Sequence, residues 1–134
     1  MPGIFLVRVF KNQAFKRFAR QAGIGDAVLC ESIRDAERGL IAADFGGGVI
    51  KQRIARPGQG KSGGFRTLIV FRAGAQAIFV HGLAKSEKDN IGKDELAALK
   101  KLASELLAYN DKAIARVVAS ETLTEAICDE KAIP

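Results

Sequence analysis

Three short runs of β-branched and aromatic residues between positions 49 and 83 constrain the fold of this 134-residue chain more than any other feature. Such runs, bounded by glycine-rich segments, are typical of β-strands. A tight Ala-Gly-Ala turn separates the second run from the third, and so short a turn joins strands that run antiparallel. We therefore predict an antiparallel three-stranded meander at Val49–Ala55, Phe65–Arg72 and Gln76–Leu83.

Apolar residues at helical spacing flank this meander on both sides. Asn12 is expected to cap a helix that Gly23 ends, and Asp26 to cap a second helix whose inner face reaches Leu40. Gly46-Gly47-Gly48 is expected to end this helical region. The remaining expected elements are a first strand at Ile4–Phe10, a helix at Lys93–Ala108, a short helix after Asn110 and a last strand at Thr122–Ile127.

This order of elements predicts an α+β fold. We expect an antiparallel sheet in the order β-α-α-β-β-β-α with helices packed on it, and a single domain over residues 1–134. The segment from about residue 110 onward is expected to form a C-terminal helical extension.

Composition places the chain among globular proteins, since 48% of its residues are hydrophobic and 27% are charged. No apolar run is long enough to cross a membrane, and the start of the chain lacks the apolar region of a secretory signal. The two cysteines, Cys30 and Cys128, are far apart in sequence, and their number excludes a disulfide framework. We therefore expect a cytoplasmic protein with reduced thiols, an inert buried Cys30, and neither metal nor cofactor.

Positive charge is concentrated in one part of the chain. The net charge is +6, and no acidic residue occurs between Asp44 and Glu87. Seven cations lie in that interval: Lys51, Arg53, Arg56, Lys61, Arg66, Arg72 and Lys85. A solvated surface usually mixes both signs, so this segregation favours a polyanionic partner over random drift in a mildly basic protein.

Residues 55–62, Ala-Arg-Pro-Gly-Gln-Gly-Lys-Ser, satisfy a permissive form of the phosphate-loop motif. That motif requires a helix after the loop, because the helix N-terminus and successive N–H groups bind the phosphates. The run that follows here is β-forming, and no later strand ends in an aspartate for magnesium. Nucleotide hydrolysis is therefore disfavoured, although the glycines and Lys61 can still bring a cationic loop close to a phosphate backbone.

The predicted strands bring cations together. Lys51 and Arg53 alternate with Ile50 and Ile54 and so share a face of one strand, and the hairpin brings Arg66 across from them. Clustered cations can stabilise the phosphorane that forms when the 2′-hydroxyl of RNA attacks its own phosphate. Mutual repulsion lowers the pKa of a lysine in such a cluster, so that it can act as a base. A patch that only binds phosphate would look the same in sequence.

The only histidine, His81, has two interpretations. It could transfer protons near neutral pH, or it could be a structural residue in the interior or at the rim with its ring nitrogens satisfied. No carboxylate on the predicted strands is available to orient it. Asp94, Glu95 and Glu105 are interpreted as ordinary charges on a solvated helix surface.

Two segments resemble the RelE/ParE superfamily of toxins, in particular its RelE/HigB-like branch. The first runs from Lys51 to Thr67 and includes Gly-Lys-Ser-Gly-Gly-Phe-Arg at residues 60–66. The second runs from Phe79 to Ile91 and includes Ala-Lys-Ser-Glu-Lys-Asp-Asn-Ile at residues 84–91. The resemblance implies a type II toxin that cuts messenger RNA without a metal, usually in the ribosomal A site, and an antitoxin encoded beside it. It departs at His81 and Leu83, where relatives often carry aromatic residues, and the only tyrosine, Tyr109, lies on a helix.

The resemblance also implies roles for individual residues. Arg66 matches the arginine that stabilises the transition state, and Lys85 matches a catalytic basic position after the last hairpin strand. Either Lys85 or His81 would handle protons. The phosphate-binding candidates are Lys51, Arg53, Arg56, Lys61 and Ser62. Two alternatives stay open: a ParE-like protein that poisons DNA gyrase without catalysis, and a nucleic-acid-binding module with no enzymatic activity.

Overall fold

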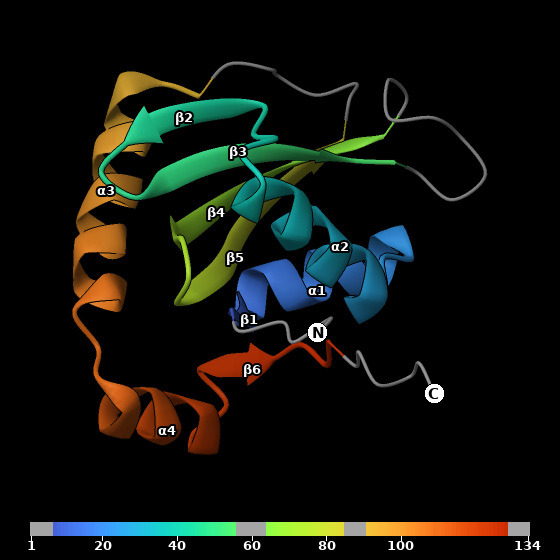
Figure 1. The fold of residues 1–134 in the computed structure, drawn as a ribbon. Coiled ribbons are helices and arrows are strands. Elements are labelled where there is room, and N and C mark those ends of the chain that lie inside the picture. The colour runs from blue at the N-terminus through green and yellow to red at the C-terminus, as the bar shows by residue number, and fades with distance from the viewer. Residues whose placement is uncertain (1–6, 56–63, 85–90, 129–134) are drawn as a thin grey trace.

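A mixed six-stranded sheet with helices on both faces organises the computed structural model, which describes residues 7–55, 64–84 and 91–128 (Figure 1). The strand order is β2-β3-β4-β5-β1-β6. The elements are β1 (Arg8–Asn12), α1 (Gln13–Ala22), α2 (Asp26–Glu37), β2 (Ala43–Gly46), β3 (Val49–Ile54), β4 (Phe65–Arg72), β5 (Gln76–Ala84), α3 (Lys93–Leu107), α4 (Asp111–Ala119) and β6 (Leu123–Glu125). This confirms the predicted α+β fold.

Strands β3, β4 and β5 form the predicted meander. β3 pairs antiparallel with β4 from Val49–Val70 to Ile54–Phe65, and β4 pairs antiparallel with β5. The burial along β3 follows the predicted alternation: Ile50, Gln52 and Ile54 are buried, whereas Lys51 is half-buried and Arg53 is exposed. The local pattern of branched and aromatic residues was therefore sufficient to define the centre of the sheet.

The sheet is not wholly antiparallel, which corrects the expectation from sequence. β1 lies beside β5 and runs parallel to it, while its other edge pairs antiparallel with β6. A parallel pair requires a long crossover connection, here the chain from α1 to β4, and no local sequence signal reports such a pairing. The expected first strand at Ile4–Phe10 overlaps β1, and its residues 4–6 lie outside the described part of the chain.

Strand β2 was not expected. The triple glycine does not end a helix but forms the turn between β2 and β3, and Gly46, Gly47 and Gly48 all adopt the left-handed backbone that favours glycine. The preceding helix α2 already ends at Glu37, so Leu40, which was expected on its inner face, is 62% exposed.

Helix α1 has the predicted ends. The Asn12 side chain accepts a hydrogen bond from the Phe15 N–H at 2.8 Å, and Gly23 closes the helix in the left-handed conformation. The cap predicted for α2 is wrong, because Gly25 occupies the N-cap position and the Asp26 carboxylate binds elsewhere.

Two cores lie on opposite faces of the sheet. Helices α1 and α2 cover one face, where Phe15, Leu29, Ile33, Ile69 and Phe79 are fully buried. Helices α3 and α4 cover the other, where Phe10, Val49, Val70, Ile78 and Ile114 are fully buried. Tyr109 packs beside them but lies between α3 and α4, which corrects the expectation that it is on a helix. None of the helices within the described ranges is long and apolar enough to span a membrane.

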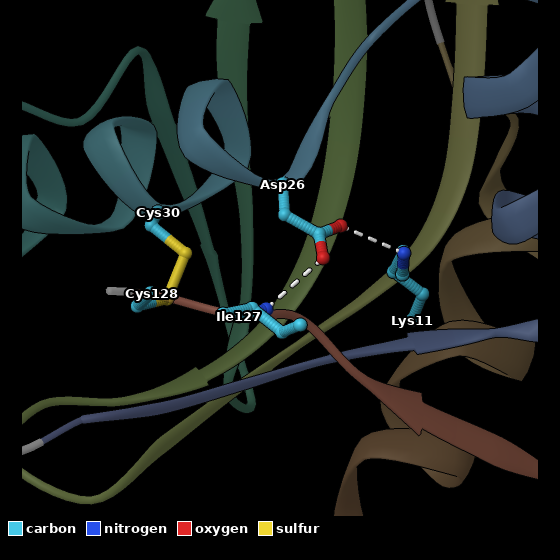
Figure 2. A network of polar contacts seen from close by, with 5 residues as sticks. All are labelled: Lys11, Asp26, Cys30, Ile127 and Cys128. Carbon is cyan, nitrogen blue, oxygen red and sulfur yellow. Dashed lines mark hydrogen bonds and ion pairs between the residues drawn. A yellow bond between two sulfur atoms is a disulfide. The ribbon is translucent and has the colours of Figure 1, made fainter. Parts of the chain in front are cut away.

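The C-terminal segment is tied back to α2 (Figure 2). Cys30 and Cys128 form a disulfide, which corrects the expectation of reduced thiols. The two residues are 98 positions apart, and they meet only because β6 returns along β1 to the start of α2. A count of cysteines could not reveal this tertiary contact.

Beside the disulfide, the Asp26 carboxylate accepts hydrogen bonds from Lys11 Nζ at 2.8 Å and from the Ile127 N–H at 3.0 Å (Figure 2). Partial burial disfavours the charged carboxyl, but these two hydrogen bonds and the charge of Lys11 outweigh burial and lower the pKa of Asp26. The ionised form of Asp26 therefore helps to hold the C-terminal segment in place.

Candidate functional site

A β-bulge in β5 decides which way His81 points. Leu68 of β4 pairs with His81 and Ile69 pairs with Phe79, so Val80 is an extra residue in β5. Val80 belongs to the core under α3, and His81 lies in a hollow bordered by α3, so both side chains are on the α3 face. Strict alternation would have placed His81 on the α1 face instead.

After the bulge, alternation resumes in β5. A Cβ added to Gly82 would collide with the ring of Phe18 in α1, so this position faces α1. Leu83 returns to the α3 face and borders the same hollow as His81. Glycine is therefore required at position 82 so that α1 can pack closely against the strand that carries His81.

The hollow that contains His81 has a volume of about 290 Å³. It lies between the ends of β4 and β5 and the first turns of α3. Its walls are mainly apolar, and among the described residues that line it, His81 and Glu95 carry polar side chains. The lining residues are Leu68, His81, Leu83, Ile91, Glu95, Ala98 and Leu99.

Lys51 and Arg66 line a second, narrower hollow together with Phe45. This hollow shares Leu68, Leu83 and Ile91 with the one that contains His81. The two hollows are therefore adjoining parts of one depression, which we call the β4–α3 groove. Lys51 from β3, Arg66 from β4 and His81 from β5 all line it.

The strand register explains this convergence. Lys51 pairs with Leu68, Arg66 pairs with Leu83, and Leu68 also pairs with His81. Residues directly opposite each other on neighbouring strands share a face of the sheet, so the three polar residues surround Leu68 on the α3 face. The sequence had predicted that Lys51 and Arg66 would lie together.

Arg53 pairs directly with Arg66 across the strands. The expectation that Arg53 would line the same site as Lys51 is wrong: the Arg53 side chain lines two hollows along α2, beside Ser32 and Asp35, and not the β4–α3 groove. Like charges directly opposite each other on neighbouring strands destabilise a sheet. The two side chains nevertheless line different hollows, although their residues are paired across the strands.

The remaining predicted site residues lie outside the described part of the chain. They are Arg56, Lys61, Ser62 and Lys85. Lys85 follows directly on the last residue of β5, and Arg56 follows two residues after the end of β3. Their roles stay predictions.

Glu95 is a groove residue that the sequence interpretation missed. It is exposed, as expected of a helix-surface charge, but it also lines the hollow that contains His81. Its Oε1 accepts a hydrogen bond from the Gly92 N–H at 3.0 Å, as a glutamate in the first turn of a helix often does. A glutamate three residues after the N-cap position is the sequence signal that could have predicted this hydrogen bond.

Among the described residues, the groove combines two permanent cations, an imidazole, the Glu95 carboxylate and an apolar floor. Guanidinium and ammonium groups bind the oxygens of a phosphate, and an imidazole can accept or donate a proton near neutral pH. Among the described residues, no three histidine, cysteine or acidic side chains gather as a metal site would require. The arrangement suits an anionic ligand that also carries an apolar or flat portion.

Comparison with known proteins matches most of the chain to one family model. The model described as the RelE toxin of the RelE/RelB toxin–antitoxin system matches residues 7–126. This range extends from the residue before β1 to the residue after β6 and so includes every strand of the sheet. No curated protein matches the chain.

Proposed function

The chain belongs to the RelE family of toxins from type II toxin–antitoxin systems, and from this premise we propose that it is an endoribonuclease that cuts messenger RNA. The observation that carries the proposal is the meeting of Lys51, Arg66 and His81, from three adjacent strands, in the β4–α3 groove. In this proposal the enzyme uses no metal and acts in the cytoplasm, on RNA held by the ribosome.

The reaction follows from the chemistry of RNA. The 2′-oxygen forms a bond to the adjacent phosphorus and the bond from phosphorus to the 5′-oxygen breaks. A base takes the proton of the 2′-hydroxyl, and an acid gives a proton to the departing 5′-oxygen. The products are a 2′,3′-cyclic phosphate and a 5′-hydroxyl. No external nucleophile is needed.

Each groove residue has a role in this proposal. Arg66 donates hydrogen bonds to the oxygens of the phosphorane, whose negative charge exceeds that of the starting phosphate. Lys51 positions the phosphate, while Arg53, Arg56, Lys61 and Ser62 hold neighbouring parts of the RNA backbone. His81 and Lys85 exchange the protons.

The proposed protein partner is an antitoxin of the RelB type, because RelE family toxins pair with RelB-type antitoxins. The sequence from residue 45 to residue 86 contains cations and no acidic residue, and an acidic partner segment would complement that charge. Such a partner would neutralise the toxin by covering the cations that contact RNA.

The test compares Arg66→Gln with Arg72→Gln. Both arginines lie on β4 and both variants remove one positive charge, but Arg72 does not line the β4–α3 groove. Transcript ends would be mapped after brief induction of each protein, and cleavage of RNA by purified protein would be measured with and without ribosomes. We expect Arg66→Gln to abolish cleavage and Arg72→Gln to retain it.

Other results would overturn the proposal in distinct ways. Equal losses in both variants would show that overall charge, not the groove, drives the effect. Intact transcripts together with DNA damage would favour a ParE-like gyrase poison. Salt-sensitive RNA binding without cleavage, even with ribosomes present, would favour a non-catalytic binding module.

A further inference from the structure

We propose that the wider part of the β4–α3 groove is a nucleobase pocket in which Glu95 selects bases that carry an exocyclic amino group. This inference rests on the proposed function, since it assigns one nucleotide of the RNA to the groove. It adds a specificity determinant on α3, whereas Arg66 and His81 lie on strands of the sheet.

The shape and lining of the pocket fit a base. Its volume of about 290 Å³ is bounded mainly by aliphatic side chains, including Leu68, Leu83 and Leu99. A nucleobase is flat and apolar on its faces and polar only along its edge. Ligand pockets of this kind combine apolar walls with a few polar groups that fix orientation, here those of His81 and Glu95.

The pocket adjoins the narrower hollow lined by Lys51 and Arg66, and this position favours a nucleotide as its ligand. Leu68, Leu83 and Ile91 border both the pocket and the narrower hollow that holds Lys51 and Arg66. A phosphate bound by the two cations would therefore carry its attached base toward the apolar pocket. A purely apolar ligand would have no use for the adjoining positive charge.

Glu95 supplies the selectivity. Its Oε1 is held by the Gly92 N–H, which fixes the carboxylate at the start of α3. An ionised carboxylate only accepts hydrogen bonds and has capacity for several. Cytosine, adenine and guanine each present an amino group that can donate to it, as cytosine N4 does to acidic side chains in nucleic-acid complexes. Uracil presents a carbonyl oxygen at the position of the cytosine amino group, and two acceptors repel.

The experiment compares Glu95→Gln with Glu105→Gln. Glutamine can still accept the Gly92 hydrogen bond, and its amide can also donate to a uracil carbonyl. Glu105 is an exposed residue of the same helix that does not line the pocket, so its variant is matched in charge. Each protein would be tested by mapping RNA cleavage sites and by titrating cytidine and uridine 5′-monophosphates while observing the methyl resonances of Ile91 and Leu99.

For the wild type and for Glu105→Gln, we expect cytidine monophosphate to bind about fivefold more tightly than uridine monophosphate. This ratio is near the lower limit of the discrimination that a specific base contact provides, because Glu95 is exposed. We expect Glu95→Gln to reduce this ratio to about one and to increase the share of cleavage sites with uracil.

The two proposals fail separately. If RNA is cut but Glu95→Gln changes neither the affinity ratio of the two monophosphates nor the cleavage sites, the pocket assignment is wrong and the proposed nuclease activity is supported. If the nucleotides shift the methyl resonances of Ile91 and Leu99 with the expected preference for cytidine monophosphate but no RNA is cut, the pocket assignment is supported and the proposed nuclease activity is wrong. Methyl shifts caused only by an antitoxin peptide would also overturn the pocket assignment.

Discussion

Reduction of the Cys30–Cys128 disulfide should destabilise the protein strongly. The bond closes a loop with a sequence separation of 98, which is most of the chain. In the chain-entropy model, a loop of this size limits the unfolded state enough to contribute about 4–5 kcal/mol to stability. The free energy of unfolding of a whole domain is about 5–15 kcal/mol, so the loss would be a large fraction of the total.

The assay is urea unfolding of the full chain with and without dithiothreitol. For a denaturant slope of about 2 kcal/mol/M, a loss of 4–5 kcal/mol moves the midpoint down by about 2 M. The variant Cys30→Ala/Cys128→Ala is the control, because it has no disulfide to reduce. Its midpoint should not respond to dithiothreitol, and it should lie near that of the reduced wild type.

Two results would refute this reasoning. One is a wild-type midpoint that dithiothreitol moves no further than that of the control variant. The other is the titration of two accessible thiols in native protein purified without reductant, which would mean that the bond does not form.

Three further changes test the packing of α1 and α2 against the sheet and the anchoring of the C-terminal segment. Gly82→Ala places a methyl group against the ring of Phe18 and should cost about 1–3 kcal/mol in chemical denaturation, whereas Gly25→Ser, with open space around its Cβ, should cost nothing. Gln52→Leu removes a buried side chain that makes three hydrogen bonds to backbone groups, and it should lower the free energy of unfolding by about 2 kcal/mol or more. A smaller decrease would mean that water replaces the amide as hydrogen-bond partner of these groups. Because folding lowers the pKa of Asp26, the contribution of its carboxylate to stability is complete above the ordinary pKa of about 3.8 and is lost as the pH falls through the lower pKa of the folded protein. Asp26→Asn should therefore flatten the dependence of the melting temperature on pH in that acidic range and not near neutrality.

Local patterns predicted the centre of this fold well. The meander follows from runs of branched and aromatic residues with a tight turn, and both ends of α1 follow from Asn12 and Gly23. Each of these features depends on interactions between residues close in sequence. These features can therefore be predicted from the sequence without knowledge of the tertiary structure.

Local sequence patterns could not predict the long-range contacts. The parallel pairing of β1 with β5 and the disulfide both join segments more than 60 residues apart. Strand β2 escaped notice because its four residues, Ala-Asp-Phe-Gly, include three types that strands disfavour and are nowhere fully buried. It exists because β3 offers it an open edge and three glycines form the turn.

The candidate site was predictable in part. Alternation along β3 and the hairpin register place Lys51 and Arg66 together, as the sequence suggested. The face on which His81 lies depends on the bulge at Val80, and alternation alone gives the opposite answer. Glu95 enters the groove only because α3 packs over β3 and β4, and its local sequence is that of an ordinary helix start.

A double-mutant cycle tests the central claim most directly, that Lys51 and Arg66 act on the same phosphate. Single-turnover cleavage of RNA, with ribosomes supplied, would be measured for Lys51→Gln, Arg66→Gln and the double variant. Because groups that stabilise one transition state act as a unit, the double variant should lose clearly less activity than the product of the two single losses. Losses that multiply would mean that the two cations act independently at separate places and would contradict a shared site.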